Sequence, residues 1–356
     1  MKKLLVTGIG MILAISGFTQ KFDMGAINGA RYLICIPDNW NGGLIMYAHG
    51  YEEIGEEIEV YEAEMNEFIE IFSSRGFAFA ESSYKRQGLV IKDGIEDTEA
   101  LRSYFEIKYG KPKMCIITGH SMGGMISLAS IERFPYEYDG AMPLCGWLAP
   151  AHSLMKHVLD VLVTYDYLFG ENSGEIVTGD DHIEPEVIQK QLEQRPDLAS
   201  LFAEHFRVRE SDLPEVISFG QYTLKESAAW LGGLPVGNTE TIYDGFGNKN
   251  QRLNREVKRY VADPDAAAYF KQYYTPTGKI SDPVLVLHTT YDELLPVENY
   301  KYYEAATRLQ GTSHLYTQQY VVSDGHCNFT LEETARALDQ LLKWIREGVR
   351  PAPDYH

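Results

Sequence analysis

The chain has 356 residues, of which 44% are hydrophobic and 23% are charged. These proportions are those of an ordinary globular protein, so they exclude a disordered chain and a coiled coil. The length exceeds that of a typical single domain, which predicts a compact core with an inserted subdomain. The formal net charge of −19 disfavours nucleic acid and anionic membrane surfaces as partners, because like charges repel.

Residues 1–19 have the pattern of an export signal. Lys2 and Lys3 give a positive start, residues 4–15 form a short apolar run, and small residues precede Gln20. The pattern predicts a signal peptide over 1–19 and a mature protein in the periplasm or outside the cell. An uncleaved N-terminal anchor is the alternative. No later stretch is long and apolar enough to span a membrane, so we expect no membrane insertion of the mature protein.

Strand and helix patterns then alternate along the first third of the chain. Apolar runs predict strands over residues 30–36, 43–48 and 77–80. Apolar side chains at helical spacing predict a helix that covers 61–72. The sequence Asp93-Gly-Ile-Glu96 resembles a capping box and predicts a second helix that begins there and ends at Gly110. Such alternation is typical of a mostly parallel sheet, which binds ligands at the carboxyl ends of its strands.

A strand–turn–helix motif occupies residues 114–129. An apolar strand ends near Ile117, the sequence Gly119-His-Ser121-Met-Gly123 follows, and an apolar helical pattern starts at Met125. Glycines on both sides of the serine let the backbone turn sharply, which exposes the hydroxyl at the N-terminus of a helix. Ser121 is therefore the candidate nucleophile.

The alternation stops after a predicted strand at 140–145. Between residues 147 and 279 the chain carries helical patterns, polar stretches and glycine-rich segments. We predict that 147–279 is a mainly helical lid inserted into a core formed by 20–146 and 280–356, and that it helps to wall the pocket. Trp147 and Trp230 are candidate substrate contacts, with packing inside the insert as the alternative. Tyr84 is a third candidate, because it follows a strand that ends near the same edge.

A nucleophilic serine on this motif should be followed by an acid and then by a histidine. Asp292 comes after an apolar strand over 283–288, where the chain leaves the sheet. It is the candidate for the acid that orients the histidine and stabilises the imidazolium. Glu293 is the rival acid, and a turn residue is the non-catalytic alternative for Asp292.

His326 is the candidate base. It lies in a short loop between a predicted last strand over 315–322 and a helix that Thr330 and Glu333 would cap. His288 lies inside a predicted strand, which favours packing over catalysis, and His314 comes too early in the chain.

In this order of motifs the chain resembles an α/β-hydrolase. The resemblance implies a mostly parallel sheet flanked by helices, with the insert placed after the sixth strand of the family fold. It also implies an oxyanion hole made of two backbone N–H groups. Met122 supplies one by its position after the nucleophile. The strand over 43–48 ends in His49-Gly-Tyr51, so Tyr51 is the candidate for the second donor, with Gly50 as the alternative.

The pair His326-Cys327 is similar to a feature of tannases and feruloyl esterases. In those enzymes the cysteine after the catalytic histidine forms a disulfide with a cysteine just before the nucleophile, and the resemblance implies such a bond here. His120 precedes Ser121 here, so that disulfide cannot form as such. Cys145 is a possible partner for Cys327. The alternative is that the four cysteines, Cys35, Cys115, Cys145 and Cys327, are all buried small hydrophobic residues.

The sequence thus predicts a serine hydrolase that cleaves carboxylic esters through an acyl-enzyme. A peptidase or amidase would use the same triad, and a catalytically dead binding protein on the same scaffold is a further alternative. The expected partner is a small-molecule ester, aromatic or sugar-linked, and no metal or organic cofactor is implied. The acidic run from Glu52 to Glu59 is interpreted as a solvated surface. The sequence leaves the oligomeric state open.

Overall fold

The computed structural model describes residues 20–55 and 65–353. The predicted signal segment, residues 1–19, lies outside them. In chain order the strands are β1 (Gln20–Ile27), β2 (Ala30–Pro37), β3 (Gly43–Ala48), β4 (Phe77–Ser82), β5 (Met114–His120), β6 (Gly140–Leu144), β7 (Val284–Tyr291) and β8 (Tyr316–Asp324). Each strand predicted from an apolar run is present, with its ends shifted by a few residues at most.

The eight strands form one sheet in the order β1-β2-β4-β3-β5-β6-β7-β8. β1 pairs with β2, and β2 with β4, in antiparallel fashion. All neighbours from β4 to β8 are parallel. The prediction of a mostly parallel sheet is therefore confirmed. β3 and β5 lie in the middle of the sheet, so the loops that leave their carboxyl ends meet at its centre.

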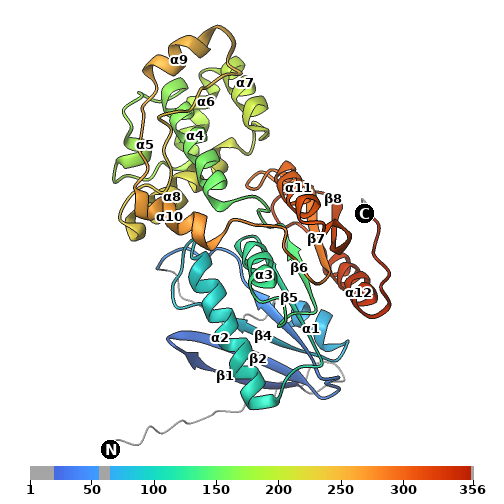
Figure 1. The fold of residues 1–356 in the computed structure, drawn as a ribbon. Helices are drawn as coiled ribbons and strands as arrows, with labels where there is room; N and C mark the ends of the chain where they lie inside the picture. Colours follow the sequence, from blue (N-terminus) through green and yellow to red (C-terminus); the bar gives the residue numbers. More distant parts are fainter. Residues whose placement is uncertain (1–19, 56–64, 354–356) are drawn as a thin grey trace, which may run out of the picture.

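Helices cover both faces of the sheet (Figure 1). The core helices are α1 (Met65–Ser73), α2 (Ile91–Tyr109), α3 (Met122–Arg133), α11 (Tyr300–Gln310) and α12 (Leu331–Glu347). Along β3, Leu44, Met46 and Ala48 belong to the hydrophobic cluster that includes α2 and α3. Ile45 and Tyr47 belong to the cluster that includes α1 and α12. This alternation buries both faces of the central strands, as a parallel sheet requires.

Every element between β6 and β7 is helical. The helices are α4 (Ala151–Leu168), α5 (Glu175–Thr178), α6 (Pro185–Glu193), α7 (Pro196–Phe206), α8 (Leu213–Leu231), η1 (Gly247–Lys249), α9 (Asn250–Glu256) and α10 (Pro264–Tyr273). They gather at one end of the molecule, with α4 and α8 packed against each other (Figure 1). Two short 3-10 helices, η2 (Val297–Asn299) and η3 (Ser313–Leu315), complete the core. The helical segment thus enters where β6 ends and returns to β7, although its action as a lid stays a prediction.

The predicted start of α2 was wrong. The helix begins at Ile91 and not at Asp93, and its N-cap residue Val90 offers no capping side chain. The carboxylate of Asp93 instead binds Lys85 at 2.9 Å and Arg86 at 2.7 Å. Its predicted end at Gly110 is confirmed, and so is the capping box of α12 between Thr330 and Glu333.

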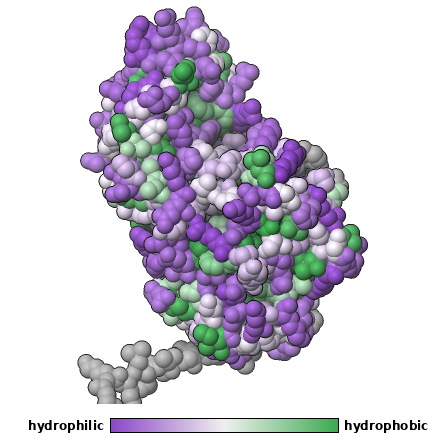
Figure 2. Space-filling model, viewed as in Figure 1, coloured by the Kyte–Doolittle hydropathy of each residue, from purple (hydrophilic) through white to green (hydrophobic). Residues whose placement is uncertain are grey.

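The face seen in Figure 2 is mostly hydrophilic, with hydrophobic residues scattered over it. This agrees with the large negative charge of −19. Within residues 20–55 and 65–353, no helix has the length and apolar character that a membrane crossing needs.

Candidate active site

Ser121 occupies a strained turn between β5 and α3. Its φ of 55° lies in the left-handed region, which residues with a side chain rarely adopt. The flanking glycines let the turn pack against the loop that follows β3. A Cβ atom at Gly119 would lie 2.2 Å from the Ala48 carbonyl oxygen, and one at Gly123 only 1.8 Å from it. Both positions therefore need glycine, and the serine is held above the edge of the sheet.

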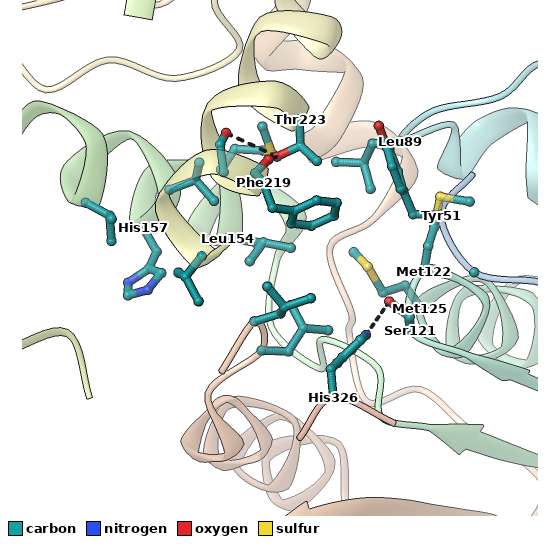
Figure 3. A pocket seen from close by; sticks show the side chains of 18 of the residues that line it. Tyr51, Leu89, Ser121, Met122, Met125, Leu154, His157, Phe219, Thr223 and His326 are labelled. Carbon is teal, nitrogen blue, oxygen red and sulfur yellow. Dashed lines mark hydrogen bonds between the residues drawn. The ribbon is translucent and has the colours of Figure 1, made fainter. Parts of the chain in front are cut away.

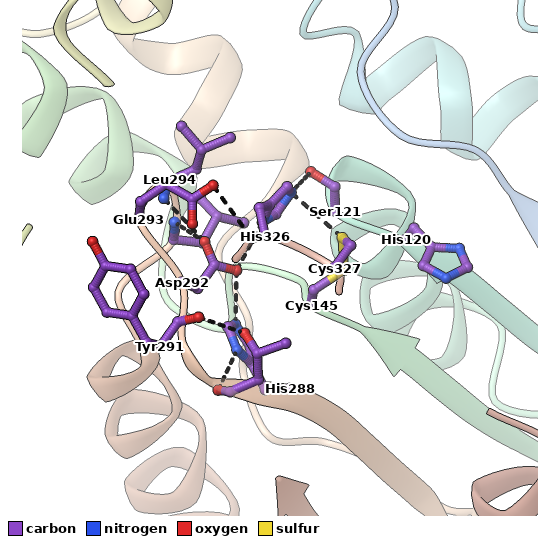
Figure 4. The surroundings of a disulfide bond; sticks show 12 residues. His120, Ser121, Cys145, His288, Tyr291, Asp292, Glu293, Leu294, His326 and Cys327 are labelled. Atoms are coloured by element: carbon purple, nitrogen blue, oxygen red, sulfur yellow. Dashed lines mark hydrogen bonds and ion pairs between the residues drawn. A yellow bond between two sulfur atoms is a disulfide. The ribbon is translucent and has the colours of Figure 1, made fainter. Parts of the chain in front are cut away.

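Three side chains form one hydrogen-bonded line (Figure 4). Ser121 Oγ lies 2.8 Å from His326 Nε2, and His326 Nδ1 lies 2.7 Å from Asp292 Oδ2. With its Nδ1 proton donated to the carboxylate, the imidazole presents the Nε2 lone pair to the serine hydroxyl. Residues that are 205 positions apart in the sequence thus meet with the geometry of a nucleophile, a base and an orienting acid.

The carboxylate of Asp292 is buried, with 2% of the residue exposed. Its second oxygen, Oδ1, accepts hydrogen bonds from the backbone N–H groups of Leu294 at 3.0 Å and Leu295 at 2.8 Å. Donors on both oxygens offset the cost of burying the charge and fix the direction of the carboxylate. This is the environment that an orienting acid needs.

The rival residues have other positions. Glu293 Oε1 accepts a hydrogen bond from the backbone N–H of His326 at 3.3 Å, so it supports the loop and does not contact the imidazole. His288 is buried in β7, and burial lowers the pKa of its imidazole. Its Nδ1 lies 3.2 Å from the Thr289 carbonyl oxygen, and its Nε2 lies 3.8 Å from Asp292 Oδ2. His314 lies in η3, before the last strand. Sequence analysis assigned His288 to packing and missed that it adjoins the acid four residues later.

The loop after β3 runs beside the nucleophile. A Cβ atom at Gly50 would lie 3.6 Å from Ser121 Cβ. Gly50, Tyr51 and Met122 line the same cavity as Ser121. Met122 is the first residue of α3, and backbone N–H groups in the first turn of a helix have no partner within the helix. The predicted oxyanion donors therefore lie at the right edge of the site, although their role stays a prediction.

A cavity of about 320 Å³ opens over Ser121 and His326 (Figure 3). Two insert helices, α4 and α8, supply half of the residues in its wall. The other half come from α3 and from the loops before α2 and after β3, β5, β7 and β8. The apolar lining residues are Leu89, Met122, Met125, Leu154, Met155, Val158, Val161, Leu162, Val216, Phe219, Leu294 and Leu295. Sequence analysis predicted that the insert helps to wall the pocket, but it could not show which helix faces border the cavity.

The three aromatic residues expected to contact substrate do not line this cavity. Tyr84 is buried in the core, where its ring stacks on His49 with centroids 3.9 Å apart. Trp147 is buried and donates a hydrogen bond to the Pro150 carbonyl oxygen at 3.2 Å. The Trp230 ring packs edge-on against Tyr269. The prediction is corrected because these rings fill space between elements, and aliphatic side chains replace them at the cavity wall.

Cys145 and Cys327 form a disulfide, with their Cα atoms 5.2 Å apart (Figure 4). The bond joins the end of β6 to the residue after His326, so the pairing left open from the sequence is present. Cys35 and Cys115 are free and buried. In the described part of the chain, the only cluster with metal-ligand spacing is Cys145, His326 and Cys327. Its two sulfur atoms are bonded to each other, which removes the thiolates that such a site would use.

A serine on a strand–turn–helix elbow, followed along the chain by its acid and its histidine, decides the fold class. The chain has the α/β-hydrolase fold. No family model matches it. It is 23% identical to the o-phthalyl amidase of Xanthobacter agilis over an alignment of 414 residues, which covers 92% of this chain and 87% of the amidase.

Solved structures similar to this chain include an esterase from Pyrococcus furiosus, with a TM-score of 0.48 and 14% identity. That match covers 92% of this chain and 91% of the esterase. Feruloyl esterase B from Aspergillus oryzae matches with a TM-score of 0.49 and 14% identity, covering 97% of this chain and 86% of that one.

Proposed function

We propose that the protein is a serine hydrolase that cleaves carboxylic esters through an acyl-enzyme intermediate. The observation that carries the proposal is the hydrogen-bonded line Ser121–His326–Asp292 at the base of an apolar cavity. A neutral imidazole held by a buried carboxylate is the base that a serine hydroxyl needs to become a nucleophile.

In the proposed reaction, Ser121 Oγ attacks the ester carbonyl carbon while His326 Nε2 takes the hydroxyl proton. The N–H groups of Met122 and Tyr51 stabilise the developing oxyanion, and each such donor is worth roughly 10²–10³ in kcat. His326 then gives its proton to the leaving alkoxide, and the alcohol departs. A water molecule, deprotonated by the same imidazole, releases the acid and regenerates Ser121.

Amide hydrolysis is the second candidate, because the o-phthalyl amidase is similar over 92% of the chain. Two properties of the cavity favour esters. A peptide needs hydrogen-bond partners for its backbone groups, whereas the wall is largely aliphatic. A phthalyl group carries a second carboxylate, and no lysine or arginine is found among the described lining residues.

The test compares p-nitrophenyl acyl esters with aminoacyl anilides. We expect turnover of the esters and labelling of the wild type by a fluorophosphonate. Ser121→Ala should lose both, with kcat lower by about 10⁵–10⁶. Ser211→Ala, at an exposed serine, is the matched control and should behave as the wild type. Turnover of the anilides alone would favour the amidase, and a wild type that does not label would favour a binding protein.

We also propose that the protein works in an oxidising compartment outside the cytoplasm. The Cys145–Cys327 disulfide supports this, because such bonds persist mainly in exported proteins. The predicted signal peptide over 1–19 points the same way.

A further inference from the structure

The insert helices that wall the cavity offer hydrocarbon almost exclusively. Leu154, Met155, Val158, Val161 and Leu162 contribute from α4, and Val216 and Phe219 from α8 (Figure 3). Such a surface binds apolar groups by removing them from water, at about 25 cal/mol per Å².

The polar groups of this wall are already paired or uncharged. Thr223 donates its hydroxyl proton to the carbonyl oxygens of Phe219 and Gly220 at 3.0 and 3.2 Å. The Tyr51 hydroxyl donates to Glu226. Burial lowers the pKa of His157, which keeps its imidazole neutral near pH 7. None of the described lining residues is a lysine, arginine, aspartate or glutamate. An ionised group in this space would therefore lose its hydration without gaining an ionic partner.

Gly220 lies on the cavity wall at a position where α8 packs closely against α4. It lies inside α8, where glycine is less favourable than alanine. A Cβ atom added there would lie 3.3 Å from Val158 Cγ1. The helices are thus in contact at this position, and even one added methyl group would press on Val158. Gly220 and Val158 both line the cavity, so this contact limits the space that a substrate chain has between the two helices.

We propose, on the basis of the ester hydrolysis proposed above, that the α4–α8 wall is a binding site for an unbranched, uncharged hydrocarbon chain of the substrate. Gly220 and Val158 set its width. The substrates are then esters of linear aliphatic acids or linear alcohols. Esters whose chain ends in a carboxylate are rejected.

The experiment measures kcat/KM for two series of esters. In one series p-nitrophenyl esters carry linear acyl chains from acetyl to decanoyl, and in the other alkyl acetates carry linear alcohols of the same lengths. We expect kcat/KM to rise with chain length in one of the two series, by at least about 10-fold overall. The series that shows the rise identifies whether the wall binds the acyl chain or the alcohol chain. For the better chain, a terminal carboxylate or a branch at its middle should lower kcat/KM by at least about 10-fold.

Two variants of the wall and one control test the role of the contact. Gly220→Val should lower kcat/KM for the longer chains by about 10-fold or more relative to acetate. Val158→Ala should raise it for branched chains, which a folding defect would not do. Ala229→Val adds the same bulk at an exposed position of α8 and should leave the profile unchanged.

Equal rates for all lengths, or equal rates for neutral and carboxylate-ended chains, would overturn the hydrocarbon site while leaving ester hydrolysis in place. Cleavage of anilides without cleavage of any ester would overturn both proposals.

Discussion

Two histidines beside the site are buried in a way that keeps them uncharged. His49 stacks on Tyr84, and its Nδ1 lies 2.9 Å from the Gly50 carbonyl oxygen. His120 is the last residue of β5, next to Ser121, and its Nδ1 lies 2.9 Å from the Tyr47 hydroxyl. Burial lowers the pKa of each from 6.5 to about 4. Neither ring takes part in the proton transfers proposed for His326.

The lowered pKa values of these two histidines predict that the folded protein loses stability in mild acid. The unfolded chain binds their protons near pH 6.5, whereas the folded protein binds them only near pH 4. The stabilisation is therefore complete above pH 6.5 and is lost as the pH falls toward 4. Each residue contributes up to about 3 kcal/mol to the change in the free energy of unfolding.

Urea unfolding at pH 7, 5.5 and 4.5 measures this change. His49→Gln removes one of the two groups, so the variant should lose less stability between pH 7 and 4.5 than the wild type. His314→Gln, at an exposed histidine, should leave the pH dependence unchanged. Equal pH dependence in His49→Gln and the wild type would contradict the prediction.

The sequence was sufficient to predict the residues that make the triad geometry, but not those that surround it. Ser121, Asp292 and His326 follow local patterns, a glycine-flanked turn and two loops after strands, and each pattern can be recognised without knowing the rest of the fold. Tyr84 and Trp230 follow no such pattern. Whether an aromatic ring faces a cavity or a neighbouring helix depends on tertiary packing, which a single sequence does not specify.

The loop after β3 and helix α8 belong to different parts of the chain and hold each other. The Tyr51 hydroxyl donates to Glu226 of α8, and the Tyr51 ring meets Phe219 edge-on, with centroids 5.4 Å apart. The other oxygen of Glu226 accepts a hydrogen bond from the Leu89 backbone N–H at 3.3 Å. The insert therefore fixes the loop that carries the proposed oxyanion donor.

This contact predicts that Glu226 acts on the reaction through Tyr51. Glu226→Ala and Tyr51→Phe should each lower kcat by about 10-fold with a smaller change in KM, because a misplaced donor weakens transition-state binding most. The double variant should be no slower than Glu226→Ala alone, since both changes remove the hydrogen bond between Tyr51 and Glu226.

Steady-state kinetics on p-nitrophenyl esters measures these effects. Glu215→Ala removes an exposed carboxylate from the same helix and should have no effect on kcat. Additive losses in the double variant would show that the two side chains act independently.

Among the helices and strands, local sequence signals gave correct predictions where residues close together in the sequence determine the structure without help from the rest of the fold. The capping box at Thr330 formed as predicted, because its partners are three residues apart. The similar signal at Asp93 failed because the carboxylate pairs with Lys85 and Arg86. β1 was not predicted, since its residues are exposed or half-buried and it lacks the continuous apolar run of the buried strands.

The disulfide connects parts of the molecule that the insert separates. Cys145 and Cys327 are 182 residues apart, and the whole helical insert lies between them. Cys327 is also the neighbour of His326 and lines the cavity. The bond thus links the two parts of the core and also holds the loop of His326, the proposed base.

Breaking this bond should reduce both stability and turnover. Loss of a cross-link over so long a loop costs up to about 5 kcal/mol by the loop-entropy estimate. The loop of His326 gains freedom as well, so we expect kcat to fall by at least about 10-fold, because small misplacements of a base are costly.

Thermal unfolding and ester hydrolysis, each with and without dithiothreitol, measure the two effects. Cys327→Ser should match the reduced wild type and should no longer respond to the reductant. Cys115→Ala removes a free buried thiol and should keep the full response. A reduced wild type with undiminished kcat would show that the loop is held by other contacts.

The wide spacing of Ser121 and His326 along the chain has a consequence for biosynthesis. The ribosome makes Ser121 long before the base, and the 205 residues between them must follow before the hydroxyl can be activated. A serine without its histidine is a poor nucleophile, and domains acquire their structure only as their segments become available. Under the proposed mechanism, the nascent polypeptide therefore does not react with esters until nearly all of the protein has been made.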